Sequence, residues 1–245
     1  MKRAMLAAMA AFIFLPRAGA AQNPAILERP RWGPQLQVTP FVGFGAAVSR
    51  VERWRFTGPG GTATDEFAVD LASGPAGGVT FEMQAVERLA VMGSLTFLTR
   101  GETLERSRAT NQVYRHAGSN FVFAKAALAL RLRESVSDLQ MHNLSGTLFI
   151  GPAFVREMPK SDANAPAVLL EATNYIGATA GLDVVVPLPF DGLTLQAGVE
   201  DYYIRWNDAE LARRNDAVVP GIESVVETNP SHNILIRAGI SVRLR

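Results

Sequence analysis

NILIRAGISVRLR, residues Asn233–Arg245, is the stretch that decides the fold of this chain. Drawn as an extended strand, it has two different faces, because successive side chains point to opposite sides. A soluble sheet would turn the apolar face toward a core, whereas a membrane barrel would turn it toward lipid and keep the charges inside. The apolar face carries Ile234, Ile236, Ala238, Ile240, Val242 and Leu244; the other carries Asn233, Arg237, Gly239, Ser241 and Arg243, and only Leu235 departs from the pattern.

Seven further segments repeat this division, which makes eight candidate strands from Gln35 onward. Their apolar faces are almost free of charge over about ten residues, the length that a tilted strand needs to cross a bilayer. A Lys or Arg on a lipid-facing surface costs about 2–4 kcal/mol at midplane, which accounts for this absence. The opposite faces are mostly Gly, Ser, Thr and Gln with isolated charges. The seven segments are 35–48, 78–86, 89–101, 120–133, 144–155, 175–186 and 193–206.

The connections between these strands alternate between long and short. In an up-and-down meander alternate connections lie on the same rim, so all the long ones share one end, as the extracellular loops of outer-membrane barrels do. The short connections are 85–89 and 189–192, with 134–143 intermediate; the long, polar ones are 49–73, 103–118, 157–173 and 207–231. The pattern predicts an all-β, eight-stranded, antiparallel transmembrane barrel whose last strand pairs with 36–48.

Two soluble architectures compete with the membrane barrel. A lipocalin-like barrel is also up-and-down, but its outer surface is expected to be rich in Lys and Glu. An exported β-sandwich is the other alternative. Small polar residues with few charges suit a narrow lumen better than a solvent-exposed surface, so the membrane barrel is favoured.

The N-terminus has the features of an export signal. Lys2 and Arg3 precede an apolar run from Ala4 to Leu15, and Ala18-Gly19-Ala20 is an A-x-A cleavage site. An uncleaved anchor helix is the alternative, although it needs about 20 apolar residues. We therefore expect a signal peptide at 1–20, a short periplasmic segment at 21–34 and a barrel domain at 35–245. The chain has no cysteine, so no disulfide supports the fold.

The chain resembles the small eight-stranded outer-membrane barrels of OmpA-like or OmpX-like type. The resemblance covers Gln35 to Arg245 and rests on the opening VTPFVGFGAAV, on YIGATAGLDVVVPLPFDGLTLQAGVEDYY and on the closing HNILIRAGISVRLR. It implies an outer-membrane location in a Gram-negative-type bacterium. The usual terminal aromatic residue is replaced by Leu244-Arg245, and a peptidoglycan-binding domain after the barrel is not expected.

A set of charged residues falls on the inward faces of the predicted strands. An eight-stranded barrel is just wide enough to be filled by side chains, and buried charges must pair. Glu200 and Arg237 lie on adjacent strands at similar distances from one long loop, so we expect them to be close. A structural polar plug is favoured over a gated ion path. The predicted inward charges are Glu82, Arg100, Lys125, Arg131, Asp183, Glu200, Arg237 and Arg243.

No catalytic constellation stands out among the three histidines. Neither His116, His142 nor His232 is followed two residues later by a serine, the His-x-Ser pattern of barrel lipases and deacylases. Glu200, Asp201 and His232 faintly echo the acidic and histidine residues of omptin-type proteases. The chain is therefore expected not to be an enzyme, with no cofactor and no metal site.

The expected role is structural or adhesive at the cell surface. The chain would act as a monomer among outer-membrane lipids, with 49–73 and 207–231 as contact surfaces for an extracellular ligand and one or two helical turns at 208–214. A net charge of +1 offers no argument for nucleic acid. The alternative is a narrow pore or small-molecule transporter, and a barrel enzyme comes third.

Overall fold

The computed structural model describes residues 36–48, 50–86, 88–133, 145–160, 171–190 and 192–244, all within the compact unit Pro34–Arg245. The expected signal peptide and periplasmic segment lie outside these residues, as does His142. Among the described residues no helix is both long enough and apolar enough to cross a membrane.

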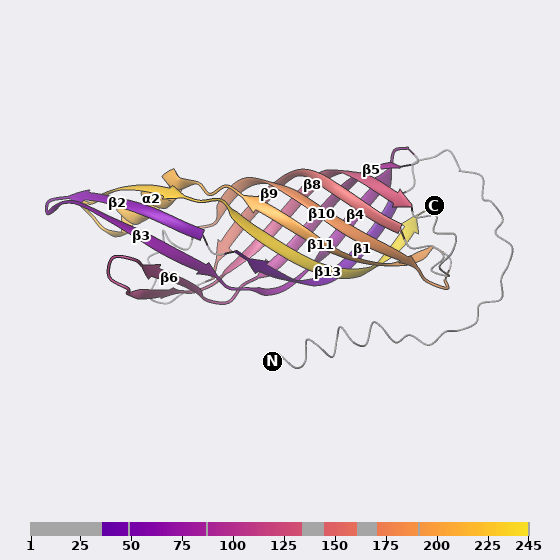
Figure 1. Cartoon of the computed structure of the whole chain (residues 1–245), viewed down its shortest axis with the longest axis horizontal. Helices are drawn as coiled ribbons and strands as arrows, with labels where there is room; N and C mark the ends of the chain where they lie inside the picture. The colour runs from indigo at the N-terminus through magenta and orange to yellow at the C-terminus, as the bar shows by residue number, and fades with distance from the viewer. Residues whose placement is uncertain are drawn as a thin grey trace. The chain divides into compact units, whose positions relative to one another are not determined.

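Eight antiparallel strands close into a barrel, as the sequence pattern predicts (Figure 1). Each barrel strand pairs with the barrel strands that come before and after it in sequence, and the last pairs with the first from Leu36↔Leu244 to Ala47↔Asn233. The expected closure between 36–48 and the C-terminal strand is confirmed. The barrel strands are β1 (Leu36–Ala47), β4 (Gly74–Gln84), β5 (Leu89–Thr99), β8 (Ser119–Arg133), β9 (Ser145–Pro159), β10 (Thr173–Pro187), β11 (Leu193–Ile204) and β13 (Ser231–Leu244).

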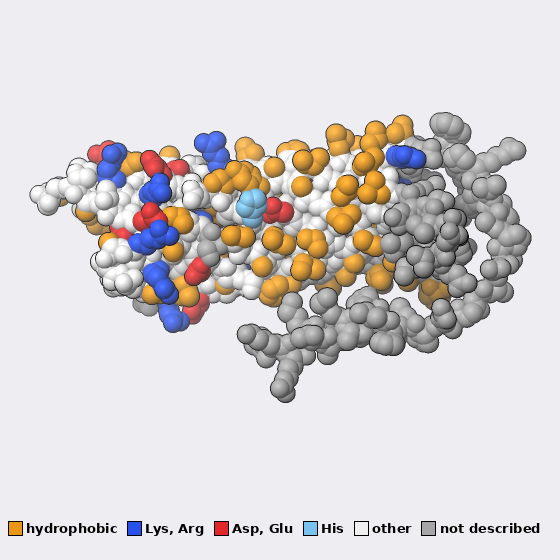
Figure 2. Space-filling model, in the orientation of Figure 1, with side chains coloured by type: hydrophobic (Ala, Val, Ile, Leu, Met, Phe, Trp, Pro, Cys, Tyr) orange, Lys and Arg blue, Asp and Glu red, His pale blue; other side chains and the backbone are white. Residues whose placement is uncertain are grey.

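The wall of the barrel has an apolar outside and a buried inside. Along β13, Asn233, Leu235 and Arg237 are buried while Ile234 and Ile236 are exposed, which is the predicted alternation. Exposed large hydrophobic side chains recur on all eight strands. Figure 2 shows hydrophobic side chains spread over the visible face of the barrel, a pattern typical of the lipid-facing surface of a membrane barrel.

The long connections are more ordered than the sequence analysis expected. They contain five further strands, which form one antiparallel sheet in the order β12-β2-β3-β6-β7, here called the extracellular sheet. It extends from the barrel end at which the long connections gather (Figure 1). Its strands are β2 (Arg50–Gly58), β3 (Gly61–Leu71), β6 (Thr103–Ser107), β7 (Val113–His116) and β12 (Glu223–Thr228).

One helix, α2 (Asp208–Val218), lies in the last long connection, where helical turns at 208–214 were expected. The side chain of Asn207 caps it by accepting a hydrogen bond from the backbone N–H of Glu210 at 3.2 Å. The helix contacts β12, so it packs against the extracellular sheet.

Candidate functional site

The interior of the barrel contains a connected ion-pair network. Lys125 Nζ lies 2.5 Å from Glu200 Oε1, and the two side chains are 0% and 1% exposed. Arg237 Nη2 lies 2.7 Å from Asp183 Oδ2, and Arg237 Nε lies 3.5 Å from Glu200 Oε2. Four of the predicted inward charges therefore form one cluster, in which Glu200 and Arg237 are close, as expected, and Asp183 lies nearer still to Arg237.

Neutral side chains complete this network across the lumen. Gln196 Nε2 donates to Asp183 at 2.7 Å, and Thr39 Oγ1 donates to Gln196 Oε1 at 2.8 Å. Arg237 Nη1 donates to Thr80 Oγ1 at 3.2 Å. The Lys125 ammonium also lies 3.9 Å from the centroid of the Phe149 ring. Two of these contacts link strands that are not paired with each other, β1 with β11 and β4 with β13.

Two glycines make room for the buried charges. A Cβ at Gly198 would lie 1.8 Å from Asp183 Oδ1, and one at Gly43 would lie 3.1 Å from the Cα of Arg237. The many glycines on the polar faces of the strands therefore have a packing reason: a larger residue at Gly198 would displace a carboxylate from its partner.

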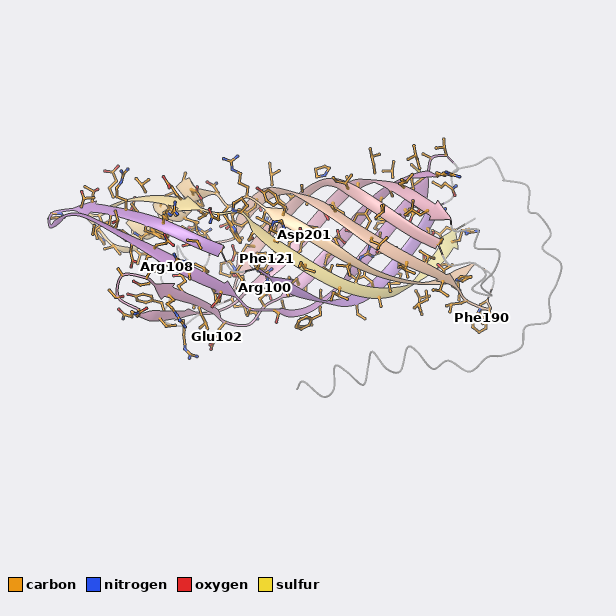
Figure 3. All side chains as sticks on the ribbon, viewed as in Figure 1. Arg100, Glu102, Arg108, Phe121, Phe190 and Asp201 are labelled. Atoms are coloured by element: carbon orange, nitrogen blue, oxygen red, sulfur yellow. The ribbon has the colours of Figure 1, made fainter. Side chains whose placement is uncertain are left out.

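The other predicted inward charges lie toward the two ends of the barrel. At the short-turn end, Arg131 Nη2 lies 2.5 Å from Glu82 Oε1. At the opposite end, Arg100 is 2% exposed, donates to the Asn233 side chain and stacks over the Phe121 ring. Figure 3 labels Arg100 and Phe121 at this end. Arg243 is exposed near the end of β13, so it does not need the buried acidic partner expected for it, because water reaches a side chain at the rim.

The interior is less polar than the sequence predicted. Between the ion-pair network and Arg100, the lumen is filled by apolar and aromatic side chains. The Phe123 and Tyr202 rings lie 4.4 Å apart, and Leu235, the one residue out of pattern in the closing strand, is 3% exposed beside them. Trp206 is 4% exposed and packs edge-on against Tyr175. An aromatic layer therefore fills the lumen on the side of the ion-pair network that faces the extracellular sheet.

Beyond this layer lies a cavity of about 330 Å³, here called the mouth pocket. It lies between the extracellular sheet, α2 and the ends of β8, β9 and β10. One wall is aromatic, with Trp54 stacked on Phe56 at 5.7 Å and edge-on to Phe67 at 6.4 Å. Ligand pockets of this size commonly combine such walls with a few fixed polar groups.

Several polar groups that line the mouth pocket form ion pairs and hydrogen bonds with one another. Arg50 is buried, lies 2.6 Å from Glu52 and sits 3.9 Å above the Trp206 ring. Burial alone would lower the pKa of Arg50, but the nearby charges of Glu52 and Glu157 outweigh it and raise that pKa above its usual value. The Trp54 indole N–H donates to the other oxygen of Glu52 at 2.9 Å. These side chains form a rigid, charge-balanced floor.

Helix α2 closes one side of the mouth pocket. Arg214, 8% exposed, donates to Thr173 and to the backbone oxygen of Glu171 at 2.8 Å, and its Nε lies 2.9 Å from Glu210. Asp208, at the start of the helix, accepts from Thr228 of β12 at 2.5 Å. Sequence reasoning did not identify this pocket, since its residues come from four separate connections; only 49–73 and 207–231 had been singled out.

The faint omptin-like set does not assemble. Glu200 faces the lumen, whereas Asp201, the next residue, faces outward and pairs with His232 at 2.6 Å. His116 lies in the extracellular sheet, 3.1 Å from Glu105. Within the described ranges no group of three or more His, Asp and Glu side chains is placed to hold a metal ion.

Solved structures share this architecture. The outer membrane protein OprG from Pseudomonas aeruginosa superposes with a TM-score of 0.53 at 10% identity, covering 84% of this chain and 96% of OprG. The outer membrane protein AlkL gives 0.48 at 10% identity, with 92% and 97% covered, and Neisserial surface protein A gives 0.39 at 11%, with 83% and 97% covered. No protein-family model and no curated protein matches the chain.

The chain thus has the fold of the small eight-stranded outer-membrane β-barrels. The apolar outer surface of the barrel, the closed eight-stranded sheet and the likeness to OprG lead to the same class. At 10% identity the likeness concerns the fold.

Proposed function

We propose that this chain is a non-conducting surface-interaction protein of the outer membrane of a Gram-negative-type bacterium, exported by a cleavable signal peptide and acting as a monomer. The observation that carries the proposal is a pair of features in one molecule: a lumen filled by an ion-pair network and an aromatic layer, and an extracellular sheet that holds the mouth pocket. In this proposal the barrel anchors the extracellular sheet in the membrane, and the extracellular sheet contacts the partner at the cell surface.

The mouth pocket suits an aromatic group with polar neighbours. Trp54 and Phe67 offer aromatic faces, and Tyr175 and Arg214 offer polar atoms at the opposite side of the cavity. Aromatic residues seated in such pockets dominate the binding energy of many protein interfaces. An aromatic side chain presented by a partner protein is the contact that we propose.

Cells that display the chain test this role. Wild-type cells should adhere to matrix-protein-coated surfaces, and Trp54→Ala should reduce the adherent fraction severalfold by removing the aromatic wall. Arg55→Ala on the exposed face of β2 is the matched control and should leave adherence unchanged. Heat-modifiable gel mobility and surface labelling establish that each barrel is assembled. Equal adherence by wild-type cells and by cells lacking the chain would contradict an adhesive role.

A narrow pore is the competing function, and it requires water to pass both the ion-pair network and the aromatic layer. We do not propose an enzymatic role, because the barrel wall separates Glu200 from Asp201 and His232.

A further inference from the structure

The cationic side chains that line the mouth pocket already donate to other groups of the protein. Arg50 Nε donates to Glu52 at 2.6 Å, and the Trp54 indole N–H donates to the second oxygen of the same carboxylate. Lys160 and Arg214 each donate to a backbone oxygen, at 2.5 Å and 2.8 Å. A ligand with a carboxylate or phosphate group would have to compete with these existing partners.

Glu157, which also lines the pocket, has one carboxylate oxygen to spare. Its Oε2 accepts a hydrogen bond from the Tyr175 hydroxyl at 3.0 Å. Its Oε1 accepts no hydrogen bond from any group in the described part of the chain. Glu157 is only partly buried, and Oε1 retains accessible surface, in contrast to the enclosed indole N–H of Trp206. An ionised carboxylate only accepts hydrogen bonds, so this oxygen selects a ligand that can donate one.

The charges around Glu157 favour a neutral donor over a cation. Glu157 interacts electrostatically with Arg50 and with Arg100, so two guanidinium groups already offset its negative charge. The pocket lining as a whole carries equal numbers of cationic side chains and carboxylates. A charged ligand would disturb this balance in a partly enclosed site, where charges interact more strongly than in water. The group that reaches Glu157 is therefore a neutral O–H or N–H.

The aromatic wall of the pocket indicates what carries this donor. The Trp54 ring stacks on Phe56 and lies edge-on to Phe67, so ring faces and ring edges are both presented to the cavity. Aromatic groups prefer offset-stacked and edge-on contacts of this kind. The cavity volume of about 330 Å³ is at the small end for ligand pockets, which suits one side chain better than a longer segment.

We propose that the mouth pocket recognises a neutral aromatic group with a hydrogen-bond donor, the phenol of tyrosine or the indole of tryptophan, and that Glu157 Oε1 accepts the hydrogen bond. The ring packs against Trp54 and Phe67 while its O–H or N–H points to Glu157. A phenylalanine ring would cover the carboxylate oxygen without supplying a donor, which is unfavourable. This inference rests on the proposed contact with an aromatic side chain of a partner protein, and it adds which side chains qualify.

Capped amino acids measure the contribution of the donor. The probes are N-acetyl-tyrosinamide, N-acetyl-tryptophanamide and N-acetyl-phenylalaninamide, all neutral, titrated against the folded chain in lipid nanodiscs and followed by saturation-transfer NMR. The tyrosine and tryptophan probes should bind about tenfold more tightly than the phenylalanine probe, as one hydrogen bond to a charged group implies. Hydrophobic contact alone would favour phenylalanine over tyrosine.

A matched pair of variants assigns the preference to Glu157. Glu157→Gln keeps an oxygen for the Tyr175 hydroxyl but removes the charge, so the preference for the tyrosine probe over the phenylalanine probe should fall severalfold. Glu105→Gln changes a second carboxylate of the same pocket, which contacts His116 at 3.1 Å, and should leave the preference unchanged. Heat-modifiable mobility verifies that each variant is folded.

The possible outcomes separate this inference from the adhesive role. Equal affinity for the tyrosine and phenylalanine probes, or an unchanged preference in Glu157→Gln, would overturn the assignment of Glu157 even if cells adhere through the aromatic wall. Tighter binding of the cationic N-acetyl-argininamide than of the tyrosine probe would also overturn it. The expected preference in the purified protein, together with no adherence by cells, would support the pocket assignment and remove the adhesive role.

Discussion

Lys125 and Glu200 form an ion pair inside the barrel, with Nζ 2.5 Å from Oε1 and both side chains withdrawn from solvent. Thr179 donates a second hydrogen bond to the same carboxylate oxygen at 2.9 Å. The pair links β8 to β11, two strands that are not paired with each other, across the lumen.

Removing one partner of this pair should be costly. Glu200→Met leaves the Lys125 ammonium buried without its carboxylate, and such losses typically cost about 3–5 kcal/mol. Lys125→Met/Glu200→Met should cost less than the single variant, because no unpaired charge remains at that position. Denaturant midpoints of the barrel refolded in lipid vesicles measure both. A double variant less stable than Glu200→Met would contradict the claim that the unpaired Lys125 ammonium causes the loss of stability.

Gly198 should tolerate no side chain. Gly198→Ala places a methyl group against Asp183 Oδ1 and 2.8 Å from the Leu182 carbonyl oxygen, which should cost about 1–3 kcal/mol as overpacking does. Gly146→Ala is the matched control, since its nearest neighbour would be 3.7 Å away. The same midpoint measurement compares the two; equal stability would contradict the close packing of the lumen.

The attachment of α2 should weaken in acid. Hydrogen bonds from Arg213 and Arg214 hold the pKa of Glu210 at about 2, below its usual 4.5. Because the folded pKa is depressed, the stabilisation is complete above about pH 4.5 and is lost as the pH falls toward 2. Tryptophan emission, which reports Trp54 in the mouth pocket and Trp206 beneath it, should change over that window. Glu210→Gln should remove this part of the pH dependence; an identical titration in that variant would contradict the assignment.

The strands of the barrel were predictable because each face meets one environment. Lipid on one side and a small lumen on the other impose a period of two that is readable in the closing strand without any neighbour. Lys125, Asp183, Glu200 and Arg237 could be placed inward by parity alone. Their pairing could not, because it depends on the register and stagger of strands far apart in sequence.

The extracellular sheet was missed for a physical reason. In β2, Arg50 and Glu52 share a face with Trp54, while Val51 and Arg53 share the other, so neither face is apolar and the alternation disappears. The aromatic layer was missed because Phe121 and Phe123 alternate with Val122 and Ala124, which makes both faces of that part of β8 apolar. The environment of Arg243 was predicted wrongly because the alternation of side chains shows which face of a strand a residue occupies but not how far it lies from the rim of the barrel.

Single-channel recording in planar lipid bilayers tests the central claim, a barrel that is closed by its own side chains. The folded wild-type protein should give no steady conductance at any applied voltage, because the Lys125–Glu200 pair and the Phe123–Tyr202 contact each bridge β8 and β11 inside the lumen. Reproducible open-channel steps from protein that is fully folded by heat-modifiable mobility would contradict the account and establish a pore.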